Sequence, residues 1–256
     1  MNGMATHFDL SDRHVFITGA ARGLGRSVAE TLAGCGAAVA VTDVDTDGCD
    51  AVAKGICAAG GTALAYPLDV ADREQFMHAA AQFAKACGRI DAVVNNAMLL
   101  RYEPLEKITP ETLSRMTAIG INGSVWGAQA LLAHYDAERG GAIINMTSPV
   151  AEKGFPNTAA YSLVKGAIVT LTKVLAAELG PRNVRVNAIA PGSVPTPGAL
   201  GLNDKAEYER RTRSIPLRRL GREEDNAQAC AFLLSGAASF INGEILHVDG
   251  GIAAAG

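Results

Sequence analysis

The feature that most constrains this chain is a regular alternation of short apolar runs with Ala-rich segments of helical length. The apolar runs lie at residues 14–18, 37–42, 62–67, 91–96, 141–146, 184–190 and 244–250. Because they are apolar throughout, they are typical of parallel strands that helices cover on both faces. Segments between them, such as 110–138 and 158–179, have the length of helices. The pattern predicts an α/β Rossmann fold, with a doubly wound, seven-stranded parallel sheet in a single domain over residues 1–256.

Capping and helix-breaking residues predict where one helix begins and another ends. Thr109 precedes Pro110, as an N-cap precedes the first helical residue, and Gly180 followed by Pro181 is expected to end the 158–179 helix. The segment 191–221 is rich in proline and glycine and follows the sixth expected strand. We expect it to form a mobile loop with short helical pieces, covering the substrate at the carboxyl edge of the sheet.

Composition limits the classes of partner. The chain has 256 residues and a net charge of −3, so no basic field suggests nucleic acid or an anionic membrane. Its 5 cysteines form no CxxC pair, and its 5 histidines show no metal-ligand spacing. The first residues do not resemble a signal peptide, and no run is long and apolar enough for a membrane span. We expect a cytoplasmic protein with a small-molecule substrate and no metal.

A glycine-rich turn follows the first expected strand and opens the first expected helix. In TGAARGLG, residues 18–25, the glycines Gly19, Gly23 and Gly25 allow the backbone to approach a pyrophosphate closely. Free amides and the positive end of the helix dipole favour negative charge there. The turn predicts a dinucleotide site that also includes Arg22 and Leu24.

An acidic residue at the end of the second strand bears on the choice of dinucleotide. Asp43 can accept hydrogen bonds from the adenosine ribose and would repel a 2′-phosphate, which favours NAD. Asp45 or Asp47 could share this task. Arg22 argues the other way, because a guanidinium in the phosphate turn could neutralise a 2′-phosphate. NAD is the favoured cofactor, and NADP stays open.

Tyr161 and Lys165 stand four residues apart in an expected helix, so their side chains share one face. A free phenol has a pKa near 10 and is a poor acid or base at neutral pH. A neighbouring ammonium would stabilise the phenolate and bring its pKa toward neutrality. A packed ring beside a solvated charge is the alternative reading of this pair alone.

Four segments, in this order, resemble the motifs of the short-chain dehydrogenase/reductase family. TGAARGLG is similar to the family's TGxxxGxG turn, NNA at 95–97 to its NNAG segment, YSLVK at 161–165 to its YxxxK signature, and PG at 191–192 to its PG turn. The resemblance runs from about residue 11 to 251. It implies a Rossmann-fold oxidoreductase that moves a hydride between a nicotinamide dinucleotide and a secondary alcohol or ketone. By analogy it also implies a homotetramer.

The resemblance further implies a catalytic tetrad of Asn122, Ser148, Tyr161 and Lys165. Tyr161 would exchange the proton of the alcohol, and Lys165 would lower the pKa of the phenol and bond the nicotinamide ribose. Ser148 would donate a hydrogen bond to the substrate oxygen. Asn122 would hold a water that relays protons between Lys165 and solvent.

Further contacts are implied in the same way. Beyond the phosphate turn and Asp43, the resemblance assigns to the cofactor Tyr161 and Lys165 together with Asp69, Val70, Asn95, Ala97, Pro191, Gly192 and Thr196. It places beside the substrate Met98, Ser148, Val150, Phe155, Tyr161 and Ser193. Met98 departs from the family, because it replaces the last glycine of NNAG. Its side chain either forms an apolar pocket wall with Leu99 and Leu100 or points into the core.

The leading functional hypothesis is an NAD-dependent dehydrogenase acting on the CH–OH group of a sugar, polyol or cyclic alcohol. The alternative enzyme is an NADPH-dependent ketone or 3-oxoacyl thioester reductase, which Arg22 favours. A third hypothesis is a catalytically silent protein that senses a dinucleotide, against which the intact tetrad argues.

Overall fold

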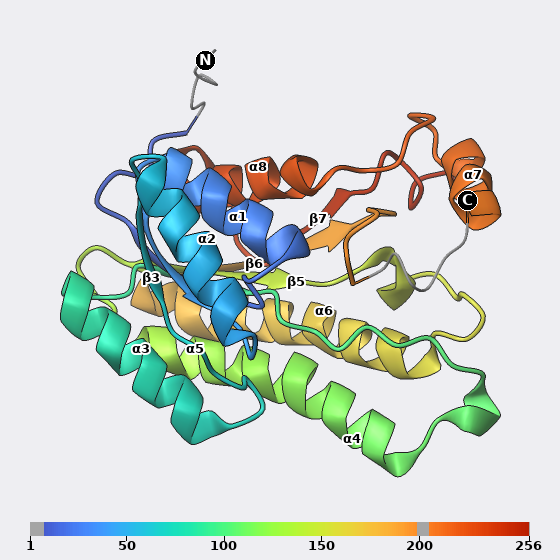
Figure 1. Ribbon diagram of the computed structural model, residues 1–256, viewed down its shortest axis with the longest axis horizontal. Coiled ribbons are helices and arrows are strands. Elements are labelled where there is room, and N and C mark those ends of the chain that lie inside the picture. The colour runs from blue at the N-terminus through green and yellow to red at the C-terminus, as the bar shows by residue number, and fades with distance from the viewer. Residues whose placement is uncertain (1–7, 199–204, 256) are drawn as a thin grey trace.

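Seven parallel strands form the central sheet, in the spatial order β3-β2-β1-β4-β5-β6-β7 (Figure 1). This computed structural model describes residues 8–198 and 205–255. The strands are β1 (His14–Thr18), β2 (Ala38–Thr42), β3 (Thr62–Ala65), β4 (Ala92–Asn95), β5 (Gly141–Met146), β6 (Val184–Pro191) and β7 (Ile245–Val248). The strand order reverses between β1 and β4, which in such sheets opens a ligand crevice at the carboxyl edge. The predicted doubly wound Rossmann fold is confirmed.

Helices cover both faces of this sheet. They are α1 (Gly23–Gly34), α2 (Thr46–Ala58), α3 (Arg73–Cys87), α4 (Pro110–Thr117), α5 (Gly123–His134), α6 (Ala159–Leu179), α7 (Lys205–Ser214) and α8 (Glu223–Leu234). Figure 1 shows α1, α2 and α8 above the sheet and α3, α5 and α6 below it. Each face has its own core: Ile17 packs in the cluster on the α1 side, and its neighbour Phe16 packs against Phe76 and Phe83 of α3. Strands buried on both faces explain the uniformly apolar runs.

The 110–138 segment is not one helix. Thr109 caps α4 as predicted, because its side chain accepts a hydrogen bond from the Thr112 amide. A π turn at Ala118–Asn122 then separates α4 from α5. The Ser124 hydroxyl donates a 2.7 Å hydrogen bond to the Gly120 carbonyl within this irregular stretch. Such turns insert one extra residue and change the face that later side chains present.

Helix α6 ends at Leu179, with Gly180 as its C-cap, as the Gly180-Pro181 pair predicts. Gly180 keeps a right-handed conformation (φ −52°, ψ −46°) and begins a 3₁₀ turn, Gly180–Arg182. The left-handed residue is Asn183, with φ of 59°. Pro181 has no N–H and cannot continue the α-helical bonding, so the chain tightens before it turns. Asparagine tolerates the left-handed region better than most residues with a side chain.

The 191–221 segment contains helix α7, and its residues 199–204 lie outside the described part of the chain. The expected substrate-covering loop is therefore described only in part. Within 8–198 and 205–255, no helix has the length and apolar character needed to cross a lipid bilayer.

Candidate active site

Ser148, Tyr161 and Lys165 meet at the carboxyl end of β5. Ser148 follows the strand by two residues in extended backbone (φ −167°, ψ 154°), and Tyr161 and Lys165 lie one turn apart on α6. The Lys165 ammonium donates a 2.6 Å hydrogen bond to the Met146 carbonyl at the end of the strand. Its Nζ lies 5.6 Å from the centroid of the Tyr161 ring. The strand end and the helix face thus bring three of the four predicted tetrad residues together.

Burial controls the protonation of this cluster. Lys165 is 5% exposed, and the loss of hydration lowers its pKa to about 8. The pKa of Tyr161 is raised above its usual value, first by burial and then by Tyr102, while a hydrogen bond with Ser148 lowers it. The expected fall of the phenol pKa toward neutrality is therefore wrong for the chain without ligand. Desolvation is the largest cause of this rise in the pKa of Tyr161.

Tyr102 forms a second aromatic wall at the cluster. Its ring meets that of Tyr161 edge to face, with centroids 5.7 Å apart. Burial raises the pKa of Tyr102, and Arg211 of α7 lowers it. Helix α7 therefore lies close enough to Tyr102 to influence the site electrostatically.

Asn122 does not join the cluster. Its side chain is exposed at the last position of the π turn, and it makes no hydrogen bond with any residue in the described ranges. Gly120 faces α6 instead: a β carbon there would lie 2.4 Å from Cγ1 of Val164 and 3.0 Å from Sδ of Met98. The π turn interrupts the helix at Asn122, and the water-holding role of this residue stays a prediction.

Met98 meets both expectations that the sequence left open. Its sulfur fills the space beside Gly120, and the residue packs against the small core of Met116, Ala160 and Val164. It also lines the pocket above the phosphate turn. Met98 therefore contributes both to the core and to the pocket wall.

A pocket of about 460 Å³ opens at the carboxyl edge, over the phosphate turn. Helix α1 begins there with no side-chain cap and no acidic residue in its first turn. The amides at the start of α1 are thus left for a ligand, and they suit the phosphates of a dinucleotide. The predicted residues that line this pocket are Gly19, Arg22, Gly23, Leu24, Asp43, Asp69, Val70, Ala97, Met98 and Thr196.

Asp43 lies at the rim of this pocket. One carboxylate oxygen accepts a 3.3 Å hydrogen bond from the Ala21 amide of the phosphate turn, and the other accepts one from the Asp45 amide at 3.3 Å. Asp45 itself caps α2 by accepting from the Gly48 amide. Arg22 is exposed beside the turn and forms no ion pair within the described ranges. The residues present therefore fit a dinucleotide whose ribose reaches a carboxylate.

The two asparagines of the NNA segment have different places. The buried Asn95 amide donates to the Ser124 carbonyl at 3.3 Å and to the Asn145 side chain at 2.9 Å, so its side chain belongs to the core. Asn96 donates to the Thr18 and Gly19 carbonyls at 2.9 Å each and lines the pocket. Asn95 does not line the pocket, and its contact with a cofactor stays a prediction. Successive residues at a strand end point to opposite sides, and sequence reasoning overlooked Asn96.

Arg115 is a second residue that the sequence did not indicate. Its guanidinium forms a 2.7 Å ion pair with Asp69, and both residues line the pocket. The two residues are 46 positions apart, and no local pattern connects them. The pair ties α4 to the loop after β3 and sets one side of the pocket.

The remaining predicted contacts are dispersed. Thr196 lies over the phosphate turn, with its Cβ 3.5 Å from a β carbon built on Gly23. Gly192 donates to the Val248 carbonyl at 3.0 Å, and it borders a different hollow together with Ser193. Pro191 ends β6. Val150 donates a 3.5 Å hydrogen bond to the Ser148 hydroxyl, whereas Phe155 is 43% exposed.

Comparisons with known proteins agree with this geometry. Residues 19–253 match the family described as enoyl-(acyl carrier protein) reductase. The chain is 36% identical over 245 residues to a cis-4-hydroxycyclohexanecarboxylate dehydrogenase of Sinomonas cyclohexanicum, covering 95% of this chain and 98% of that one. It is 33% identical over 243 residues to a 3-oxoacyl-[acyl-carrier-protein] reductase of Thermotoga maritima, with coverage of 95% and 98%.

Solved structures are also similar. A gluconate 5-dehydrogenase from Burkholderia cenocepacia, in complex with NADP and tartrate, has a TM-score of 0.93 and 32% identity, covering 98% of this chain and 99% of that one. A 7α-hydroxysteroid dehydrogenase complexed with NADH and 7-oxo glycochenodeoxycholic acid has a TM-score of 0.93 and 31% identity, with 97% coverage of both. With its phosphate turn, its Ser148–Tyr161–Lys165 cluster and these relatives, the chain belongs to the short-chain dehydrogenase/reductase family of oxidoreductases.

Proposed function

We propose that this oxidoreductase is an NAD-dependent dehydrogenase that interconverts a secondary alcohol and its ketone, with a sugar, polyol or cyclic alcohol as substrate. The observation that carries the proposal is the cluster of Ser148, Tyr161 and Lys165 on the edge of the sheet that also holds Asp43 and the phosphate turn. An acid/base group and a dinucleotide pocket on one edge support hydride transfer.

The chain supplies proton transfer and orientation. A nicotinamide dinucleotide, when bound, accepts or donates the hydride. The Ser148 hydroxyl would donate to the substrate oxygen, and the Tyr161 phenol would take the alcohol proton in oxidation or return it in reduction. Since burial raises the pKa of Tyr161, the phenol is protonated at neutral pH in the chain alone. It is therefore ready to donate, and oxidation requires added positive charge beside it.

Asp43 supports NAD over NADP. Its carboxylate is half-buried and anchored by two backbone amides, so it cannot swing away from a 2′-phosphate without losing both hydrogen bonds. Repulsion between a fixed carboxylate and a phosphate disfavours NADP. The same carboxylate oxygens would instead accept hydrogen bonds from the ribose hydroxyls of NAD.

A second candidate is an NADPH-dependent reductase of ketones or 3-oxoacyl thioesters. Arg22 favours it, because an exposed guanidinium without an ion-pair partner in the described residues lies in the same pocket as Asp43. The similarity to the Thermotoga maritima reductase supports the same candidate.

One assay separates the two candidates. The absorbance of reduced nicotinamide is followed with NAD or NADP and a panel of sugars, polyols and cyclic secondary alcohols, with Tyr161→Phe as the control. Turnover with NAD that the variant lacks supports the dehydrogenase. The reductase is favoured if ketones are reduced with NADPH and none of these alcohols is oxidised with NAD.

We also propose that the enzyme works in the cytoplasm as a homotetramer. The 5 cysteines are all free, which suits a reducing compartment. Helix α6 exposes Leu163 and Val174, at 65% and 52%, and an exposed apolar helix face is suited to a two-fold contact. Light scattering during gel filtration tests the assembly, and a monomer would contradict it.

A further inference from the structure

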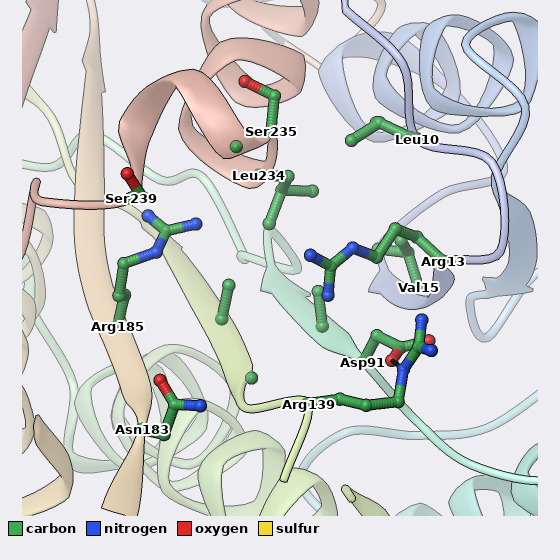
Figure 2. A pocket seen from close by; sticks show the side chains of 14 residues that line it. Leu10, Arg13, Val15, Asp91, Arg139, Asn183, Arg185, Leu234, Ser235 and Ser239 are labelled. Atoms are coloured by element: carbon green, nitrogen blue, oxygen red, sulfur yellow. Dashed lines mark ion pairs between the residues drawn. The ribbon is translucent and has the colours of Figure 1, made fainter. Parts of the chain in front are cut away.

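A second pocket lies at the amino edge of the sheet, opposite the candidate active site (Figure 2). The starts of β1, β4, β5 and β6 and the end of α8 line a cavity of about 190 Å³. One water molecule in the liquid takes about 30 Å³. The cavity therefore has room for a small ion and several waters.

One group of charges in this pocket is balanced. The Asp91 carboxylate is 1% exposed and accepts from the Arg89 Nε at 2.8 Å and from the His14 amide at 2.8 Å. Arg139 lies 3.7 Å from the same carboxylate and pairs with Asp12 at 2.8 Å. Two arginines and two aspartates thus neutralise one another.

Arg13 and Arg185 are left without a carboxylate. Neither has an ion-pair partner within 8–198 and 205–255, although both are half-buried. Figure 2 shows their side chains entering the pocket from opposite sides. Burial lowers the pKa of Arg185, and repulsion from Arg13 lowers it further. The guanidinium of Arg185 has one long contact of 3.5 Å with the Ile241 carbonyl.

The surrounding backbone does not cancel these charges. Helix α8 ends at Leu234 in the pocket wall, and a helix C-terminus carries about half a negative charge. This half charge offsets only part of the two guanidinium charges, so the pocket keeps a net positive charge in a protein whose net charge is −3.

We propose that the pocket between Arg13 and Arg185 binds a doubly charged oxyanion, namely a phosphate group. Two guanidinium forks present paired N–H donors that fit phosphate oxygens, and a dianion balances both charges. A carboxylate would leave one arginine uncompensated. The site is separate from the phosphate turn, because it lies at the opposite ends of the strands.

Calorimetric titration with inorganic phosphate tests the proposal. The enzyme is first saturated with its dinucleotide so that the phosphate turn is occupied, and chloride keeps the ionic strength constant. Arg13→Gln/Arg185→Gln removes two charges from the pocket, whereas Lys54→Gln/Lys85→Gln removes two exposed charges elsewhere. We expect phosphate binding to weaken about tenfold or more in the arginine variant, as for the loss of one charge-assisted hydrogen bond, and to stay unchanged in the lysine variant.

A second probe, glycerol 2-phosphate, identifies the source of the phosphate group. Binding of both probes indicates a phosphorylated metabolite, and binding of inorganic phosphate alone indicates the free ion. Equal weakening in both double variants, or no heat of binding in the wild type, would overturn the proposal. If the double variant does not fold, Arg13→Gln alone gives the same comparison, and unchanged affinity there has the same meaning.

Discussion

Two buried clusters, one at each edge of the sheet, handle charge in opposite ways. At the carboxyl edge, burial shifts the pKa of Tyr161 and Lys165 toward their neutral forms, and no carboxylate in the described residues pairs with the lysine. At the amino edge, the buried Asp91 is held by Arg89, Arg139 and the His14 amide. Uncompensated groups are costly to bury and cluster at functional sites, whereas a compensated buried pair becomes destabilising only when one partner is removed. Of these two clusters, the one of Tyr161 and Lys165 is therefore the candidate for chemistry.

The N-termini of three helices at the carboxyl edge show the same contrast. Asp45 caps α2 and Asp72 caps α3, each accepting backbone hydrogen bonds with its side chain. Helix α1 has no such cap, and its first residues border the dinucleotide pocket. A cap contributes about 1 kcal/mol of stability. Helix α1 lacks this contribution, and a phosphate bound at its N-terminus could take the place of the missing cap.

The largest effect is expected at the carboxyl edge, from Tyr161→Phe. Removing the phenol oxygen takes away the proton donor and acceptor, so turnover should fall by about 10²- to 10⁴-fold. The unfolding free energy should change little, because the ring and its contact with Tyr102 remain. Steady-state rates and urea unfolding of both proteins measure this. Turnover retained in the variant would assign the proton transfer to another group.

The second prediction concerns Lys165 and pH. Its pKa is about 8 in the folded chain and 10.5 in the unfolded chain, so the unfolded state binds more protons between these values. Stability contributed by this group therefore rises with pH through that window, by about 3 kcal/mol in full. Lys165→Met should lack the rise. Urea unfolding of the wild type and the variant at pH 7 and pH 10 measures this rise. An equal change in unfolding free energy with pH in both proteins would show that the lysine is not desolvated.

At the amino edge, Asp91→Asn should lower the unfolding free energy by about 2 kcal/mol, because charged hydrogen bonds to Arg89 are lost. Turnover per folded molecule should stay unchanged. Asp50→Asn is the matched control, since its exposed pair with Lys54 spans 3.9 Å and contributes about 0–1 kcal/mol. An equal loss in both variants would remove the distinction between buried and surface pairs.

The sequence predicts most of the fold and part of the site, for identifiable reasons. Apolar runs and helical segments predict the sheet, and a four-residue spacing predicts that Tyr161 and Lys165 share a helix face. The π turn that interrupts the helix at Ala118–Asn122 is not revealed by composition. The ion pair of Arg115 with Asp69 depends on tertiary packing alone. Burial, which raises the pKa of Tyr161, is likewise a property of the folded chain.

The smallest expected effect is on cofactor choice, from Asp43→Ser. Removing the carboxylate abolishes repulsion of a 2′-phosphate and leaves Arg22 in the pocket to attract it. The ratio of kcat/KM for NADP to that for NAD should rise about tenfold or more, which corresponds to about 1.4 kcal/mol. Asp47→Asn is the control, because this exposed carboxylate in the first turn of α2 is close in sequence but does not line the pocket. A ratio that rises equally in both variants would mean that the general negative field of the edge, and not the position of Asp43, discriminates between the dinucleotides.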